Sequence, residues 1–254
     1  MTPKPKVEVA REHLTKAQEE ADGGGLPDAE LWASRLLRDR RRAARHQTAE
    51  LAAITAAVES RSHGLGAAAL VLTGSTARGR RTDVSDLDYH VIGAHPRVDD
   101  LPADIDLYCD EPAEFYAKLA RGDDFAHWTL RYGCVLFDSG VLRDAAAHVA
   151  GHDVWPDPAR KLRQAKRALD FAERLAASGD YPALREQVRG ALSLTARWWL
   201  LAHDVFPLAR DELPVQLVQT RQIALARALG GSIHDRPDVA ALTASLTTAR
   251  ALTG

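Results

Sequence analysis

The sequence predicts an α+β fold, in which a small mixed β-sheet core with flanking helices is followed by an all-α helical bundle domain. Hydrophobic residues make up 46% of the 254 positions, enough to build a sizeable core. Apolar residues repeat with a helical period near both ends of the chain and with a strand-like alternation in between. We therefore divide the chain into an N-terminal helical extension, the core and a helical C-terminal domain, at residues 1–27, 28–150 and 151–254.

The N-terminal region is expected to be helical. A charged helical stretch over residues 6–21 ends at the glycine run 23–25. A second helix is expected from Asp28, a plausible N-cap, to about residue 60. Six arginines fall between residues 35 and 45. They form either a solvated helix face or a local patch for phosphate or a partner.

The sequence pattern predicts four strands in the middle of the chain. A wholly apolar run at 67–72 indicates a buried strand, and residues 86–93 and 104–109 alternate between apolar and polar side chains. A short apolar run at 135–137 predicts the fourth strand. Intervening helices are expected at 76–80 and 112–120.

The helical period returns after residue 156. Breakers such as the Ser178–Gly179 pair and Pro207 divide this region, and Pro182 is tolerated in the first turn of a helix. The four helices expected here span 159–177, 180–203, 211–231 and 235–250.

Composition excludes several classes of protein. The chain has 33 Lys+Arg and 35 Asp+Glu, a net charge of -2, which argues against a protein that coats nucleic acid. The only cysteines, Cys109 and Cys134, exclude a disulfide framework and a cysteine-built zinc site, and they suit a reducing cytosol. No apolar run reaches the roughly 18 residues of a membrane span, and the N-terminus has no apolar segment typical of a secretory signal. We therefore expect a cytoplasmic protein without a membrane partner.

Three carboxylates are the candidate metal ligands. Asp86 and Asp88 are two residues apart on a predicted strand, so both side chains project from one face. Close carboxylates repel each other unless a cation joins them, and hard oxygen ligands suit Mg²⁺. Asp106, on the next predicted strand, can supply the third carboxylate, and Asp104 is its competitor. Carboxylates on adjacent strands suit two metal ions about 3.5–4 Å apart.

A glycine–serine turn complements these acids. Gly74 and Ser75 follow the first predicted strand and lead into a helix expected at Thr76. Backbone N–H groups at such a turn can hold phosphate oxygens, and glycine lets the backbone approach closely. The Ser75 hydroxyl can donate to a β- or γ-phosphate.

The order of these motifs resembles the DNA polymerase β-like nucleotidyltransferase superfamily. Its pattern is a strand, Gly-Ser, roughly ten residues, Asp-x-Asp and a third acid on a later strand. Gly74, Ser75, Asp86 and Asp88 match outright, and Asp106 matches better than Asp104. The resemblance covers about residues 45–140, including a closing segment at 128–138. The helical region behind it is similar to bacterial small-molecule nucleotidyltransferases of the aminoglycoside and lincosamide type.

The resemblance implies a cytoplasmic nucleotidyltransferase that moves a nucleoside monophosphate, AMP from ATP, to a hydroxyl of a small-molecule acceptor. Antibiotic modification is one such activity. It implies two Mg²⁺ ions held by Asp86, Asp88 and Asp106, which are also the catalytic residues. It further implies that Gly74, Ser75 and Arg78 bind the nucleotide. Two alternatives stay open: an antitoxin-like nucleotidyltransferase that modifies a partner protein, and a non-catalytic nucleotide-binding scaffold. The oligomeric state is also open.

The distribution of charged residues around the candidate site indicates what kind of acceptor would bind there. Between residues 83 and 124 there are twelve acidic and three basic residues. This suits Mg²⁺ and a cationic acceptor such as an aminocyclitol, although acidic solvated loops explain it equally well. It suits a nucleic acid poorly.

Other candidate residues give weaker evidence of a functional role. For His90, a supporting or surface role is preferred to metal ligation. His127 and the Trp198–Trp199 pair are assigned to packing, with stacking on a ligand as the alternative for the tryptophans.

Overall fold

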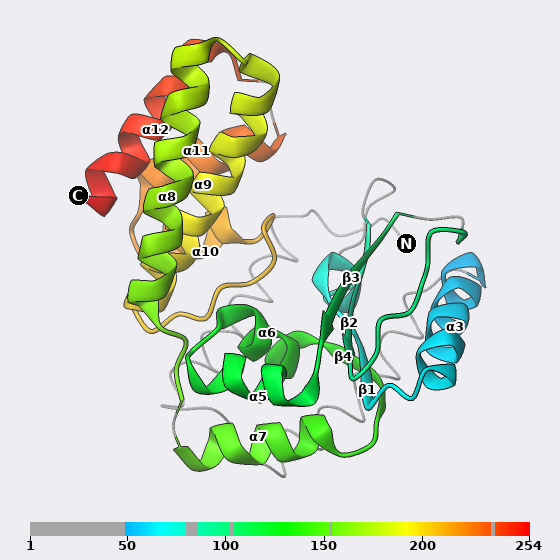
Figure 1. Ribbon diagram of the computed structural model, residues 1–254. Coiled ribbons are helices and arrows are strands. Elements are labelled where there is room, and N and C mark those ends of the chain that lie inside the picture. The colour runs from blue at the N-terminus through cyan, green and yellow to red at the C-terminus, as the bar shows by residue number, and fades with distance from the viewer. Residues whose placement is uncertain (1–48, 80–85, 102–103, 153, 235–236) are drawn as a thin grey trace, which may run out of the picture. The chain divides into compact units, whose positions relative to one another are not determined.

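The computed structural model describes residues 49–79, 86–101, 104–152, 154–234 and 237–254. These residues form two compact units that meet in sequence at Pro156. We call them the sheet unit, up to Pro156, and the helical unit, from Asp157 to Gly254. The predicted α+β class, a small mixed sheet with helices followed by a helical bundle, is confirmed (Figure 1). The predicted N-terminal extension and the arginine-rich face at 35–45 lie outside the described residues.

The sheet unit contains four strands in the spatial order β3-β2-β1-β4. β2 runs antiparallel to β1 and parallel to β3, while β1 and β4 are antiparallel. All four strands lie within two residues of their predicted positions. Their bounds are β1 Ala69–Leu72, β2 Leu87–Ile92, β3 Ile105–Asp110 and β4 Cys134–Asp138.

Helices cover both faces of this sheet (Figure 1). The five helices of the unit are α3 Ala49–Gly64, α4 Gly74–Ala77, α5 Pro112–Ala120, α6 Asp124–Tyr132 and α7 Val141–His152. On one face Ala69, Val71 and Ile92 form a buried cluster with apolar residues of α5, α6 and α7. On the other face Tyr89 is fully buried, and its hydroxyl lies 2.9 Å from that of Thr55 on α3.

Two helices of the sheet unit, α6 and α7, are absent from our prediction. Asp123 caps the start of α6, and its carboxylate accepts hydrogen bonds from the N–H groups of Phe125 and Ala126. Nearly all of α6 is buried, including charged and polar residues such as His127 and Arg131. Its apolar residues do recur with helical spacing, but over nine residues this pattern is too short to identify a helix from the sequence alone. A third difference is α4, which is a single turn over Gly74–Ala77 rather than a helix over 76–80.

The junction between α6 and β4 needs glycine. A Cβ added at Gly133 would lie 2.3 Å from Val71 Cγ1 and 2.5 Å from the Thr129 carbonyl oxygen. Gly133→Ala is therefore expected to lower the free energy of unfolding by about 1–3 kcal/mol, the usual range for overpacking. Gly64→Ala is the matched control, because nothing lies within 4 Å of its added Cβ. Urea unfolding of both variants tests this, and equal midpoints would contradict it.

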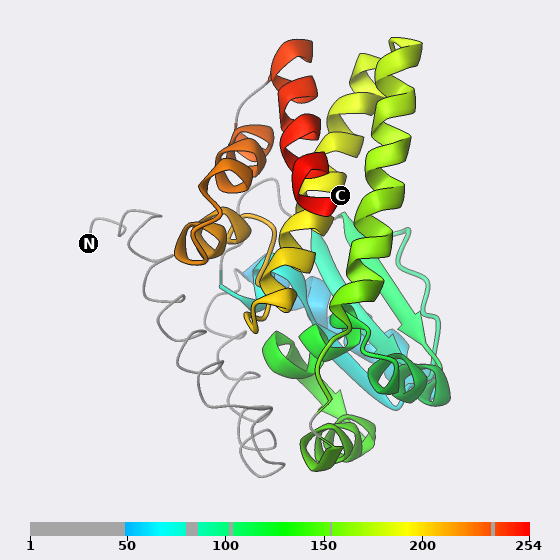
Figure 2. The same cartoon turned by 90° about the vertical axis from the view of Figure 1, so that its left-hand side faces the viewer.

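The helical unit is a bundle of five helices. They are α8 Pro158–Ser178, α9 Tyr181–Ala202, α10 Leu213–Gln219, α11 Ile223–His234 and α12 Val239–Thr253. α8, α9 and α12 run side by side (Figures 1 and 2) around a buried core of mainly leucine and alanine. Asp157, Asp180 and Asp238 cap α8, α9 and α12 by accepting backbone N–H groups. No helix in the described part of the chain is both long and apolar enough to cross a membrane.

The single helix predicted over 211–231 is wrong, because the structure has two helices there. The chain breaks between α10 and α11 at Arg221, which has a φ of 60°. α11 then continues through Gly230 and Gly231, where we expected it to end. Glycine costs a helix only about 1 kcal/mol per residue, and packing of Leu225 and Leu229 in the bundle core offsets that cost.

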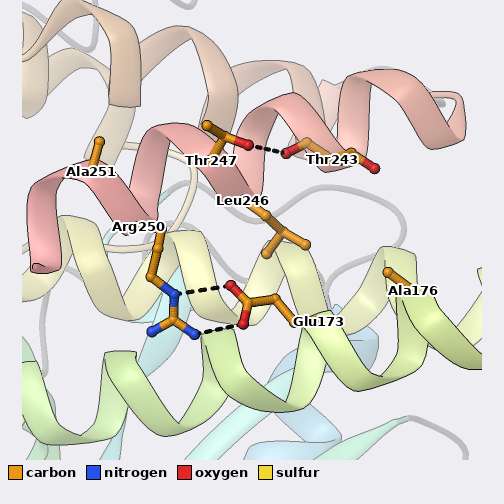
Figure 3. Close-up of a pocket in the computed structure, with 7 residues that line it drawn as sticks. All are labelled: Glu173, Ala176, Thr243, Leu246, Thr247, Arg250 and Ala251. Carbon is orange, nitrogen blue, oxygen red and sulfur yellow. Dashed lines mark hydrogen bonds and ion pairs between the residues drawn. The ribbon is translucent and has the colours of Figure 1, made fainter.

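Two residues that line a surface cavity between α8 and α12, Glu173 and Arg250, form an ion pair with each other (Figure 3). Arg250 of α12 donates two hydrogen bonds of 2.9 Å to the Glu173 carboxylate of α8. It also donates to Asp170 on the same helix. The guanidinium therefore joins the two helices.

Candidate metal centre

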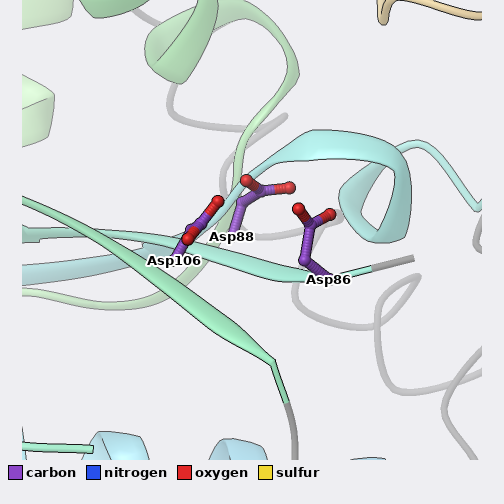
Figure 4. Close-up of side chains that lie close together, drawn as sticks. All are labelled: Asp86, Asp88 and Asp106. Carbon is purple, nitrogen blue, oxygen red and sulfur yellow. The ribbon is translucent and has the colours of Figure 1, made fainter. Parts of the chain in front are cut away.

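Asp86, Asp88 and Asp106 come together at one end of β2 and β3 (Figure 4). Each offers one carboxylate oxygen, and these oxygens lie within 4.8 Å of one another. Asp86 immediately precedes β2, whereas Asp88 lies within it and pairs in parallel register with Asp106 of β3. The pleat places residues two apart on the same face, so the spacing of the first two acids and the register of the third produce the cluster.

The third member of the cluster is Asp106. Asp104, its competitor, lies two residues earlier, where its carbonyl accepts the Leu87 N–H at 2.9 Å. Among the described residues, the acidic cluster contains Asp106 and not Asp104. Pairing between β2 and β3 thus places Asp106, the residue that the sequence comparison preferred, beside Asp88.

The three carboxylates fit a hard divalent cation. Oxygens bound to one Mg²⁺ at about 2.1 Å lie at most about 4.2 Å apart. The observed limit of 4.8 Å is close enough for small side-chain rotations to bring the oxygens onto one ion. Asp86 and Asp106 are exposed and Asp88 is half-buried, which leaves room for water and substrate oxygens in the remaining coordination positions.

The glycine–serine loop lies directly against Asp88. Gly74 has a φ of 63°, and a Cβ added there would fall 1.8 Å from Asp88 Oδ2. The N–H and hydroxyl of Thr73 both donate to the Asp88 carbonyl, at 2.8 and 3.2 Å. We expected this glycine to allow close approach of phosphate, but its immediate neighbour in the structure is the Asp88 carboxylate. Phosphate binding by Gly74 and Ser75 stays a prediction.

Arg78 lies just behind this loop, at the end of α4. Its guanidinium stacks over the Tyr132 ring of α6, 4.7 Å from the ring centroid, and the residue is buried. The Cys134 thiol donates to the Ala77 carbonyl at 3.4 Å and so ties the end of α4 to β4. Both cysteines are free, as expected. The assignment of Arg78 to nucleotide binding stays a prediction.

A buried polar network supports β2 and β3 beyond the acids. His90 has no exposed surface, and its ring nitrogens lie 3.0 Å from the Thr129 hydroxyl and 3.1 Å from Asp110 Oδ2. Lys118 of α5 pairs with the same Asp110 carboxylate. Burial raises the pKa of Asp110, but the hydrogen bonds from His90 and Lys118 outweigh it, and the net pKa lies below its usual range.

This network gives His90 a buried position and brings in residues that the sequence did not predict for the site. The surface alternative for His90 is wrong, and the supporting role is what the structure has. Asp110, Lys118 and Thr129 are missing from our predicted site. The only signal was the alternation of β3, which places Asp110 on the same face as Asp106. It did not show that α5 and α6 cover that face.

His127 packs inside the sheet unit, as predicted. It has no exposed surface, Nε2 donates to the Leu119 carbonyl at 3.2 Å, and Nδ1 is buried without a hydrogen-bond partner. Burial is the main cause that lowers its pKa to about 4. Charging this ring would bury an unpaired donor, so the folded protein keeps it neutral.

The low pKa of His127 predicts acid sensitivity. The unfolded chain, with a pKa of 6.5 for this group, binds one proton more than the folded chain between pH 6.5 and about 4. Stability therefore falls as the pH falls through that window, by up to about 3 kcal/mol in all. His127→Gln, which keeps a donor for the Leu119 carbonyl, is expected to flatten this slope. Urea unfolding at pH 7 and pH 5 measures it, and an unchanged slope would contradict the assignment.

No protein-family model and no curated protein sequence matches this chain. Among solved structures, this chain is similar to a nucleotidyltransferase-like protein from Exiguobacterium sibiricum, with a TM-score of 0.40 and 16% sequence identity. The alignment covers 77% of this chain and 71% of that one. A likeness of this degree carries no argument about the site, so the function is inferred from the residues themselves.

Proposed function

We propose that this protein is a metal-dependent nucleotidyltransferase. It transfers a nucleoside monophosphate, AMP from ATP, to a hydroxyl of a small-molecule acceptor. The observation that carries this proposal is the convergence of Asp86, Asp88 and Asp106 directly beside the Gly74–Ser75 loop. The same residues form the ordered motif by which the sequence resembles the polymerase β-like superfamily.

The three carboxylates hold the metal in this proposal. Two bound Mg²⁺ ions would neutralise charge on the triphosphate and on the attacking and leaving oxygens. Asp86 and Asp88 would hold both ions, and Asp106 would hold the ion nearer the acceptor and take the proton of the acceptor hydroxyl. The acceptor oxygen forms a bond to the α-phosphorus, the α–β phosphoanhydride bond breaks, and pyrophosphate leaves. Positioning and electrostatic stabilisation supply most of the rate.

The order of strands supports separate places for the two substrates. The Gly74–Ser75 loop follows β1, on one side of the Asp86–Asp88 pair, and Asp106 lies on β3, on the other side. With the triphosphate against the loop, the acceptor approaches from the β3 edge.

A labelling experiment tests this function. The purified protein is incubated with Mg²⁺, a metabolite panel or host lysate, and NTPs labelled on either the α- or the γ-phosphate. We expect α-label on a small molecule and γ-label in pyrophosphate. α-Label on protein would indicate the antitoxin-like alternative, γ-label on an acceptor would indicate a kinase, and no transfer would indicate a scaffold. Each of these three results would contradict the proposal.

A further inference from the structure

The sheet face that carries the acidic cluster continues into the buried polar network. Side chains two residues apart on a strand share a face, so His90 follows Asp88 on β2. For the same reason Asp110, four residues beyond Asp106, lies on the same face of β3. His90 and Asp110 are buried, whereas Asp106 is exposed. One pair of strands therefore carries the candidate metal ligands and, further along, a buried polar pair.

Side chains of this network join β2 and β3 to each other and to the helices that cover them. A carboxylate only accepts hydrogen bonds, so we assign the proton of His90 Nε2 to the 3.1 Å bond with Asp110 Oδ2. Lys118 of α5 pairs with the other oxygen of the same carboxylate. The His90 ring also contacts Phe115 of α5 and Phe125 of α6, at centroid distances of 5.4 and 5.2 Å. Both strands are thus fixed to α5 and α6 on this face.

The strand that carries Asp106 needs this fixation more than its neighbour does. In the described part of the chain β3 is the edge strand and pairs with β2, whereas β2 has a strand on each side (Figure 1). Asp88 and Asp106 are paired in register, and their carboxylates repel each other when no cation joins them. This repulsion favours a wider spacing of the two strands, which would separate oxygens that must reach one ion.

We propose that His90, Asp110 and Lys118 are positioning residues for the metal centre. They hold β3 against β2 and so keep Asp88 and Asp106 close enough to bind one ion. This proposal rests on the proposed function for the metal site itself. Its effect is on metal affinity, which can be measured without turnover.

The test measures Mn²⁺ affinity by electron paramagnetic resonance in two variants of His90. His90→Phe keeps a ring but loses the donor to Asp110. We expect it to bind Mn²⁺ about three- to tenfold more weakly, a smaller loss than is typical when a group bonded directly to a metal ligand is removed. His90→Gln has an amide N–H donor that can reach Asp110, and it should restore most of the affinity.

Lys118→Met separates positioning from charge. Removing a cation from the sheet unit makes the unit more negative, so charge alone predicts tighter Mn²⁺ binding. Positioning predicts weaker binding, because Asp110 loses its partner on α5. The Lys118 side chain is 25% exposed, so this variant decides the question even where His90→Phe does not fold.

Thr55→Val is the matched control. It removes the buried hydrogen bond between the Thr55 and Tyr89 hydroxyls, on the opposite face of β2. It should therefore lower the free energy of unfolding and leave Mn²⁺ affinity unchanged. All affinities are measured at a temperature at which circular dichroism shows each variant to be folded.

Four results would overturn the positioning role and leave the proposed function intact. They are wild-type Mn²⁺ affinity in His90→Phe, an equal loss in His90→Gln, an equal loss in Thr55→Val, and unchanged or tighter binding in Lys118→Met. Absence of Mn²⁺ binding by the wild type would refute both proposals. Failure of the transfer assay, with the expected order of Mn²⁺ affinities, would refute the proposed function and leave the positioning role standing.

Discussion

Asp88→Asn is expected to lower metal-dependent nucleotidyl transfer by about a thousandfold or more. Asparagine keeps the shape of the side chain but removes an anionic ligand from the centre of the cluster, where Asp88 lies within 4.8 Å of both partners. Without metal, thermal stability should hold or rise, because repulsion among the carboxylates is relieved. Initial rates at saturating Mg²⁺ and NTP, with thermal melts in EDTA, measure both effects.

Asp104→Asn is the control for this result. Asp104 is exposed on the same edge but lies outside the cluster, so its variant should keep turnover within about threefold of wild type. Retention of more than about a tenth of the activity in Asp88→Asn would mean a barrier change of only about 1.4 kcal/mol. Such a small change would refute its role as a ligand.

Gly74→Ala is expected to remove nearly all activity as well as some stability. Alanine at a φ of 63° costs about 1–2 kcal/mol of backbone strain. Its Cβ would also meet Asp88 Oδ2 at 1.8 Å, so the carboxylate must rotate out of the cluster. We therefore expect turnover of the folded variant to fall by at least about a hundredfold, close to the effect of losing the ligand itself.

Gly66→Ala separates the effect of backbone strain from the effect of the contact with Asp88. Gly66 has a similar φ of 75°, but nothing lies within 4 Å of an added Cβ. This variant should lose about the same stability and keep its turnover. Activity and urea unfolding measured together decide the point, and equal activity in the two variants would show that the loop does not constrain Asp88.

The strands and the carboxylates could be predicted because their signals are local. Alternation marks β2 and β3, and the two-residue spacing of Asp86 and Asp88 fixes their shared face. The pairing of Asp88 with Asp106 depends on the parallel register of two strands. No local pattern shows that register, so Asp104 remained a competitor until the register was known.

The supporting residues could not be predicted because they depend on tertiary packing. His90 and Asp110 are polar side chains on a strand face that would be solvated if α5 and α6 did not cover it. The tight contact of Gly74 with Asp88 joins segments fourteen residues apart, and it gives the glycine a different neighbour from the expected phosphate. Local propensity likewise placed a helix end at Gly230, where bundle packing continues the helix.

Binding of Mn²⁺ tests the metal centre most directly. Protein-bound Mn²⁺ is measured by electron paramagnetic resonance with a nonhydrolysable ATP analogue, for wild type, Asp88→Asn and Asp104→Asn. We expect wild type and Asp104→Asn to bind the ion and the analogue together, and Asp88→Asn to bind Mn²⁺ at least about tenfold more weakly. Equal Mn²⁺ affinity in wild type and Asp88→Asn, or no protein-bound Mn²⁺ in wild type, would contradict it.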